Sequence, residues 1–266
     1  MSRLPRAAVR AAGQLAARWR DRLTARALDA TTALAGRGLL VVAPHPDDET
    51  FGCGALIARA RAAGAPVTVI VASDGARSTG SQLIGPATLA AVRRAELHEA
   101  CARLGVADVV ELGHPDGSLR GRSRLAGELA EIAASRRPEV VLTPFAQDPH
   151  PDHTAAHHAT VAAWPAMPGR PIVLGYPVWT WHAGPFFPAA APGRRLSLQT
   201  WAIRQLWSEP WWRIPTGAYA GHKQRAVTAY RSQTTNLTGE PGWSFLQPDF
   251  VQLFLGADEV FLPVRI

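Results

Sequence analysis

An apolar run meets an acidic cluster in Leu39-Leu40-Val41-Val42-Ala43-Pro44-His45-Pro46-Asp47-Asp48-Glu49. The run 39–43 is short, rich in β-branched residues and bounded by Gly38 and Pro44, which predicts a buried strand. The residues from Phe51 onward predict a helix. The acidic cluster therefore follows the carboxyl end of a strand, where open α/β sheets place their binding sites.

The cluster gathers one imidazole and three carboxylates, and its like charges repel one another. A divalent cation is the commonest reason to hold such groups together. The alternative is a helix N-cap, where the helix dipole favours acidic residues. A cap needs one carboxylate rather than three and a histidine, so we predict a metal site.

Apolar strands alternate with amphipathic helices from residue 38 onward, which predicts a sheet covered on both faces. The fold class we expect is α/β, with a Rossmann-like, doubly wound, mostly parallel sheet and an irregular Trp/Pro-rich C-terminal portion. Dinucleotide binding is not expected, because Gly52-Cys53-Gly54 lacks the third glycine of the phosphate-binding motif. The expected strands are 39–43, 67–72, 109–112, 140–143, 172–175 and 260–264, and the expected helices are 51–63, 86–104, 123–135, 153–164 and about 219–231.

Polar side chains follow the first four of these strands, in segments that share one edge of a parallel sheet. We therefore expect them to converge on one pocket. The segments are His45 to Glu49, Ser73-Asp74-Gly75, Gly113-His114-Pro115-Asp116-Gly117 and Asp148-Pro149-His150-Pro151-Asp152-His153.

A hydrolytic zinc site uses three protein ligands and leaves one position open for water. His45 and Asp48 are three residues apart across a sharp turn, so both can reach one ion, and a third ligand must come from another loop. The tripeptide His-Pro-Asp begins at His45, His114 and His150, and the first and last copies have a second candidate ligand close behind. The middle copy has none, so we expect His114 to line the pocket or cap a turn rather than bind metal.

These motifs resemble those of the PIG-L/LmbE-like zinc-dependent N-deacetylases. The resemblance rests on the hexapeptide 44–49 with the later His-Pro-Asp-His at 150–153. Weaker pieces are Ser73-Asp74-Gly75, Arg93-x-x-Glu96, Pro115-Asp116-Gly117 and Lys223-x-x-Ala226 running to Ser232-Gln233. It covers roughly residues 38–266, so we expect a deacetylase domain at 37–266 and a basic, Arg/Ala-rich helical extension at 1–36.

The resemblance implies a role for each residue of the two main motifs. Zinc would be bound by His45, Asp48 and His153, Asp47 would be the general base, His150 the electrophile or acid near the oxyanion, and Asp152 would orient an imidazole. We expect Arg77 and His114 on the substrate side of the pocket. Fe²⁺ or Co²⁺ would also suit these donors. Two alternatives stay open: Asp47 could instead hold a ligand histidine, and Arg77 could be a solvated loop residue.

The net charge of +7 is concentrated near the N-terminus. Residues 1–37 carry eight Arg and two Asp, hence +6, which leaves +1 for the rest and argues weakly for nucleic-acid binding. The helical spacing of apolar residues in 1–36 fits either a helix packed on the domain, which we favour, or an anchor on an acidic membrane surface. No apolar run has membrane-spanning length and no secretory signal is evident, so a cytoplasmic location is expected. The two cysteines, Cys53 and Cys101, are expected as buried free thiols.

The leading hypothesis is a hydrolase that removes acetyl from an N-acetylated amino sugar or its conjugate, a small-molecule substrate. A metal-dependent esterase or phosphoesterase is an alternative, which would need a second ion. A non-catalytic glycan-binding relative is another. The Trp-rich segment 179–218 could hold an aglycone or belong to the core, and the sequence leaves this open.

Overall fold

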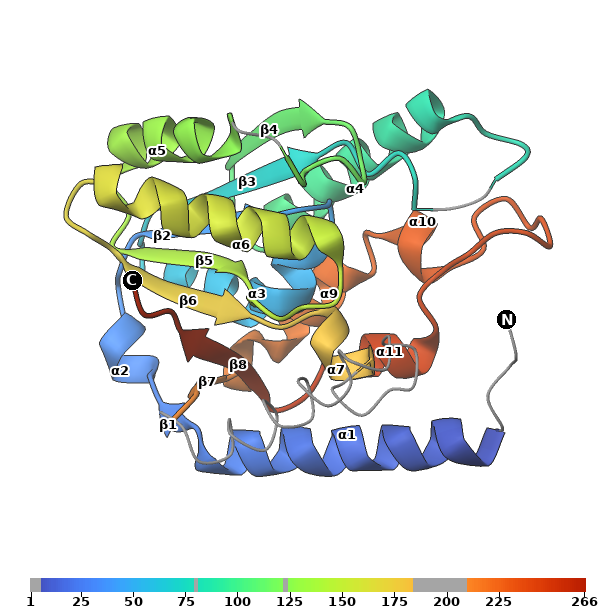
Figure 1. The fold of residues 1–266 in the computed structure, drawn as a ribbon, viewed down its shortest axis with the longest axis horizontal. Coiled ribbons are helices and arrows are strands. Elements are labelled where there is room, and N and C mark those ends of the chain that lie inside the picture. The colour runs from blue at the N-terminus through green and yellow to red at the C-terminus, as the bar shows by residue number, and fades with distance from the viewer. Residues whose placement is uncertain (1–5, 79–80, 122–123, 184–209) are drawn as a thin grey trace.

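A computed structural model describes residues 6–78, 81–121, 124–183 and 210–266 (Figure 1). The strands are β1 (Leu28–Asp29), β2 (Leu39–Ala43), β3 (Val67–Ser73), β4 (Asp108–His114), β5 (Val140–Pro144), β6 (Ile172–Tyr176), β7 (Trp212–Pro215) and β8 (Asp258–Pro263). The main helices are α1 (Arg6–Arg26), α3 (Asp48–Ala62), α4 (Pro86–Arg103), α5 (Leu125–Arg136), α6 (Pro151–Ala163) and α9 (Ala220–Val227). Shorter helices are α2 (Thr31–Leu34), α7 (Trp179–Ala183), α10 (Arg231–Thr234) and α11 (Pro248–Gln252), with 3₁₀ turns at Trp164–Ala166 and Gly217–Tyr219.

The strands form one eight-stranded sheet in the order β1-β7-β8-β6-β5-β2-β3-β4. The five strands from β6 to β4 run parallel, which confirms the predicted α/β class with a mostly parallel sheet. β8 is antiparallel to both of its neighbours, β6 and β7, which the sequence did not reveal.

Both faces of the sheet are covered, as Figure 1 shows, with α5 and α6 on one face and α3, α4 and α9 on the other. Successive residues of β2 point to opposite faces. Leu39, Val41 and Ala43 therefore pack into the core under α3, while Leu40 and Val42 pack toward α5 and α6. Burial on both sides explains why the central strands read as uninterrupted apolar runs.

The order of the strands reverses between β2 and β5. From β2 the chain continues to β3 and β4 on one side, whereas β5 and β6 lie on the other side. Loops that leave neighbouring strands in opposite directions open a crevice at the carboxyl ends of those strands. The two main motifs of the sequence follow β2 and β5, and the fold thus brings them together.

The C-terminal part differs from the prediction. A single helix over about 219–231 is wrong, because α9 ends at Val227 and α10 begins only at Arg231. Between them Tyr230 has a non-helical ψ of 59° and its side chain is completely buried. The short strands β1 and β7 were not predicted, since runs of two and four residues are too short to show a period.

Residues 14–34, inside the expected N-terminal extension, pack on the rest of the chain. Trp19 and Leu23 of α1 are buried in the main core, and β1 pairs with β7 at the edge of the sheet. The Trp19 ring lies 5.8 Å from that of Trp181, which lies 6.0 Å from that of Trp211. Trp181 and Trp211, both within the Trp-rich segment, are therefore core residues. In the part of the chain that the structure describes, no helix is long and apolar enough to cross a membrane.

Gly52 allows α3 to lie against β6. A Cβ at this position would be 2.3 Å from Cδ2 of Tyr176, whose ring is fully buried and whose hydroxyl donates to the Val42 carbonyl at 2.8 Å. Because that ring is held from both ends, we expect Gly52→Ala to lower the free energy of unfolding by at least about 2 kcal/mol. Chemical denaturation measures the change.

Gly127 provides the matched control for this substitution. It also lies in a helix, α5, but no heavy atom comes within 4 Å of a Cβ built there. Gly127→Ala should therefore raise stability by about 0.5–1 kcal/mol through helix propensity alone. Equal effects at the two glycines would contradict the proposed collision with Tyr176.

Candidate metal centre and active site

Asp48 lies between two histidines that come from distant parts of the chain. Its Oδ2 atom is 3.2 Å from Nδ1 of His45, in the loop after β2, and 3.2 Å from Nε2 of His153, in the first turn of α6. Ligands about 2.0–2.1 Å from one tetrahedral ion are roughly 3.3–3.4 Å apart, close to these spacings. One ion could therefore contact all three side chains.

The environment of the His153 ring is consistent with a metal ion on its Nε2 atom. The side chain is completely buried, yet neither ring nitrogen makes a hydrogen bond of good geometry, although oxygens of Asp48 and Asp148 lie 3.2 and 3.3 Å away. A buried polar atom without a partner is costly in a stable protein. A cation on Nε2 would satisfy the ring, so these residues fit a divalent metal.

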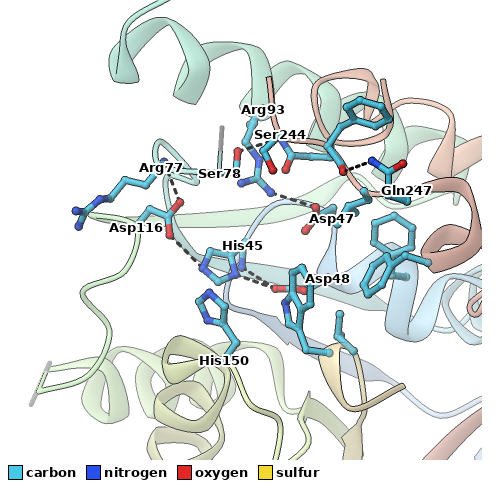
Figure 2. A pocket seen from close by; sticks show the side chains of 17 residues that line it. His45, Asp47, Asp48, Arg77, Ser78, Arg93, Asp116, His150, Ser244 and Gln247 are labelled. Carbon is cyan, nitrogen blue, oxygen red and sulfur yellow. Dashed lines mark hydrogen bonds and ion pairs between the residues drawn. The ribbon is translucent and has the colours of Figure 1, made fainter. Parts of the chain in front are cut away.

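Carboxylates lie behind both histidines. Nε2 of His45 is 3.2 Å from Asp116 (Figure 2) and 3.5 Å from Asp152, and Nδ1 of His153 is 3.3 Å from Asp148. Such carboxylates fix the orientation of a ligand imidazole and raise its basicity. Asp152 was expected to orient an imidazole, and the one that its carboxylate approaches is that of His45.

Asp148 and Asp152 are themselves held by backbone groups. Asp148 accepts from the N–H groups of Val178 and Thr180 at 3.1 and 3.2 Å, and Asp152 accepts from those of Gly117 and Leu119 at 2.9 and 3.1 Å. Through these bonds the two carboxylates tie the segments after β4, β5 and β6 to the site.

The electrostatics of the cluster follow from burial and from opposite charges. Although burial acts to raise it, the imidazoles of His153 and His45 hold the pKa of Asp48 well below its usual range. Asp48 therefore stays ionised, as a metal ligand must.

Asp47 occupies a strained position at the start of α3. Its backbone has φ 126° and ψ −30°, a conformation that non-glycine residues rarely adopt. Its carbonyl accepts from the N–H of Phe51 at 2.9 Å, and its own N–H donates to Glu49 at 3.1 Å. The carboxylate points into the cavity toward Arg93, whose Nη2 is 3.2 Å away (Figure 2). Burial raises the pKa of Asp47 to about 8, and Arg93 opposes this only in part.

Arg93 and Glu49 hold this turn in place. The Arg93 guanidinium is buried and donates to the carbonyls of Pro46 and Gly75. Glu49 is completely buried and also accepts from Thr50 and from the hydroxyl of Tyr230. Glu49 is thus an acid hydrogen-bonded within the fold at the start of α3.

His150 is the N-cap residue of α6. Its Nδ1 accepts from the N–H of Asp152 at 3.2 Å, so Nε2 carries the proton of the neutral ring. Burial lowers the pKa of His150 to about 4, and His45 and His153 act in the same direction. A nitrogen from each of these three histidines lies within 4.8 Å of the other two. His150 is thus a neutral hydrogen-bond donor beside the metal ligands.

A cavity of about 450 Å³ opens over these residues. It is lined by His45, Asp47, Asp48, Phe51, Arg77, Ser78, Arg93, Asp116, His150, Val178, Trp179, Gln233, Ser244, Phe245, Leu246, Gln247 and Phe250. The expected Arg77 is among them, and its N–H donates to Asp116 at 2.9 Å. Asp152 and His153 lie beneath the surface, behind His45 and Asp48.

His114 is not among the residues that line the cavity. It is the last residue of β4, and it points to the same face as Val110 and Leu112, toward α5. There its Nε2 lies 2.8 Å from a carboxylate oxygen of Glu128. The expectation that His114 contacts substrate is therefore not supported by the geometry.

Three further polar residues, Gln233, Lys223 and His157, lie outside the two main motifs. Gln233 lines the cavity and donates to Ser78 at 3.0 Å. Buried Lys223 is not among the residues that line this cavity, and its Nζ lies 2.8 Å from Oε1 of Glu259. Nδ1 of His157 lies 2.9 Å from the Pro144 carbonyl and does not join the metal group. Both cysteines are buried and free, as predicted.

Sequence reasoning missed the roles of Asp116, Asp148 and Arg93. All three stand in or near motifs that the sequence singled out, but the side-chain partners of Asp116 and Arg93 are 71 and 46 positions away, and Asp148 is held by backbone groups of Val178 and Thr180. The only signal was that each acid follows a strand of the parallel sheet. No sequence pattern predicted that Phe245 and Phe250 would line the cavity.

Comparison with known proteins places these motifs in a family context. Residues 40–164 match the family described as PIG-L: GlcNAc-PI de-N-acetylase. A 1D-myo-inositol 2-acetamido-2-deoxy-alpha-D-glucopyranoside deacetylase of Thermobifida fusca is 33% identical over 195 residues, which cover 60% of this chain and 64% of the relative. A probable N-acetyl-alpha-D-glucosaminyl L-malate deacetylase 2 of Bacillus cereus is 32% identical over 145 residues, 52% of this chain and 66% of the relative.

The chain thus spans just under two thirds of the length of either curated relative. Among solved structures, the N,N'-diacetylchitobiose deacetylase of Pyrococcus horikoshii superposes with a TM-score of 0.62 at 18% identity. The matched region covers 86% of this chain and 84% of the deacetylase chain. At that identity the similarity demonstrates a shared fold.

Proposed function

This chain contains a PIG-L family domain, and from that premise we propose that it is a metal-dependent hydrolase that removes acetyl from an N-acetylated amino sugar or its conjugate. The observation that supports this best is that Asp48 lies 3.2 Å from nitrogens of both His45 and His153. The two curated relatives, each named as a deacetylase of a glucosamine conjugate, support the class of substrate.

We assign His45, Asp48 and His153 as the metal ligands and Zn²⁺ as the ion, with Fe²⁺ or Co²⁺ as alternatives. His153 is preferred over His150 because its Nε2 lies 3.2 Å from Asp48 and its Nδ1 lies 3.3 Å from Asp148, whereas Nδ1 of His150 accepts from a backbone N–H. When bound, the ion supplies a Lewis acid that polarises the acetamide carbonyl and lowers the pKa of water.

Asp47 acts as the general base in this proposal. Its carboxylate faces the cavity and is not shared with a ligand histidine. In its ionised form it can accept a proton from the attacking water and then return it to the departing amine. Arg93 keeps the carboxylate directed into the cavity.

His150 stabilises the carbonyl oxygen as negative charge develops on it. The sequence suggested a protonated imidazole, but burial lowers the pKa of His150 to about 4. We therefore assign this role to the neutral ring, which donates from Nε2 because Nδ1 accepts from the backbone. Arg77 and Asp116 supply polar groups at the other side of the cavity for the hydroxyls of a sugar.

Metal removal tests the proposal directly. We expect the chelator-treated protein to release no acetate from N-acetylglucosamine or its conjugates, and one equivalent of Zn²⁺ per chain to restore activity. Acetate is measured by a coupled assay and metal by elemental analysis. Acetate release that persists without metal would reject the mechanism. Two ions per chain, with turnover of phosphate esters instead, would favour the phosphoesterase alternative.

A further inference from the structure

The cavity over the metal ligands has one apolar wall. This wall consists of Phe51, Val178, Trp179, Phe245, Leu246 and Phe250, and we call it the aromatic wall. Its residues come from α3, from the segment that runs into α7, and from the segment that runs into α11. They are far apart in sequence, so the fold itself has assembled an apolar surface beside the polar site.

The aromatic wall is supported from behind by closely packed rings. The Phe250 ring lies 5.0 Å from Trp179 and 5.1 Å from Phe254, and Phe254 lies 5.1 Å from Phe51. Phe51, Phe250 and Phe254 are buried, whereas Trp179 and Phe245 keep part of their surface exposed at the cavity. A wall held in this way is already formed before a ligand arrives, which reduces the ordering cost of binding.

The side chains of Arg77 and Asp116 lie elsewhere in the cavity. Figure 2 shows Arg77 and Asp116 on one side of the metal ligands and Gln247, which precedes α11, on the other. Sugar hydroxyls find partners near Arg77 and Asp116, and the acetamide must reach Asp47 and Asp48. A group attached to the sugar then extends toward the aromatic wall.

The charges of the lining residues restrict that group further. Apart from histidines, the cations among the described lining residues are Arg77 and Arg93. Arg93 already serves Asp47 and two backbone carbonyls, and Arg77 lies across the site. A carboxylate or phosphate at the aromatic wall would lose its hydration without gaining a cation among these residues.

We propose that the substrate is an N-acetylated amino sugar with an apolar, alkyl or aryl aglycone that binds the aromatic wall at Trp179 and Phe245. This inference rests on the proposed deacetylase function and specifies its substrate class. Inositol and malate, which the names of the two curated relatives contain, are polar groups, so this chain would differ from those relatives in what it accepts.

A series of alkyl N-acetylglucosaminides with methyl, propyl, butyl and hexyl chains tests the inference on the zinc-loaded full chain. Burial of each additional methylene is worth about a fourfold gain in affinity, so kcat/KM should rise about fourfold per carbon until the wall is covered. In Trp179→Ala and Phe245→Ala the slope, taken relative to each variant's own rate on the methyl glycoside, should fall to below about twofold per carbon. Trp164→Ala, which removes a half-buried tryptophan from the far end of α6, is the control and should keep the full slope.

Calorimetry of the deacetylated alkyl glucosaminides supplies a readout that does not depend on turnover. Binding should show a heat-capacity change that becomes more negative with chain length in the wild type, and much less so in Trp179→Ala. A wild-type slope that is flat, or one that survives both substitutions, would overturn the aglycone inference and leave the deacetylase intact. No acetate from any member of the series would reject the proposed function instead.

Discussion

His153→Ala should lose both the metal and the activity. The substitution removes one of three ligands, and loss of a residue that only orients a ligand already weakens metal binding by about 10–100-fold. We therefore expect zinc affinity to fall by more than about 100-fold and acetate release to become undetectable at equimolar zinc. Competition with a chromophoric chelator measures the affinity.

His157→Gln is the matched control, because His157 lies one turn further along α6 and is also buried. Its ring is paired with the Pro144 carbonyl at 2.9 Å rather than with the metal group. We expect this variant to retain zinc at wild-type affinity. If it lost zinc as His153→Ala does, the ligand set would have to be redrawn to include a helical histidine pair.

Asp47→Asn should leave the metal in place and abolish most of the catalysis. Asparagine has the same shape and tolerates a positive φ, but it cannot accept the proton from water. General-base catalysis contributes typically about 10²–10⁴-fold, so kcat should fall by that factor with little change in KM. Steady-state acetate release, with zinc content measured on the same sample, gives both quantities.

Asp148→Asn distinguishes a base from a carboxylate that only orients a ligand. Asp148 lies 3.3 Å from Nδ1 of His153, so its substitution should weaken zinc binding by about 10–100-fold, and excess zinc should restore turnover. Excess zinc should not rescue Asp47→Asn. If it did, Asp47 would be a residue that supports the metal site, the alternative that the sequence left open.

The central sheet could be predicted because its strands are buried on both faces. The run from Leu39 is apolar at every position and that from Val140 is interrupted only by buried Thr143, a pattern that a solvent-facing strand does not show. The outer strands carry no such signal. β7 has only four residues, and β8 was predicted as a strand but not in its direction. That direction depends on partners distant in sequence, so the antiparallel pairing of β8 could not be read from any local pattern.

The candidate site divides in the same way. His45, Asp48 and His153 could be named from motifs because a metal requires particular donors at close spacing, and those donors follow two strands that end at the same edge. The supporting groups could not, because Asp148 and Asp116 act through atoms that only the fold brings near. The same tripeptide, His-Pro-Asp, gives different outcomes at 45 and 114. His45 lies beyond the end of β2 and reaches the site, whereas His114 is still within β4 and its ring contacts Glu128 of α5 instead.

The order of residues along the chain was sufficient for the α/β class, and its motifs, with the family that they resemble, led to the proposed metal-binding donors and the proposed acid beside them. Tertiary packing alone directed Trp179 to the cavity and Trp181 to the core, although they are two residues apart. It also closed the aromatic wall from three separate segments. Side chains that meet through long-range contacts have no fixed separation along the chain, and for that reason the group attached to the sugar could be inferred only from the folded structure.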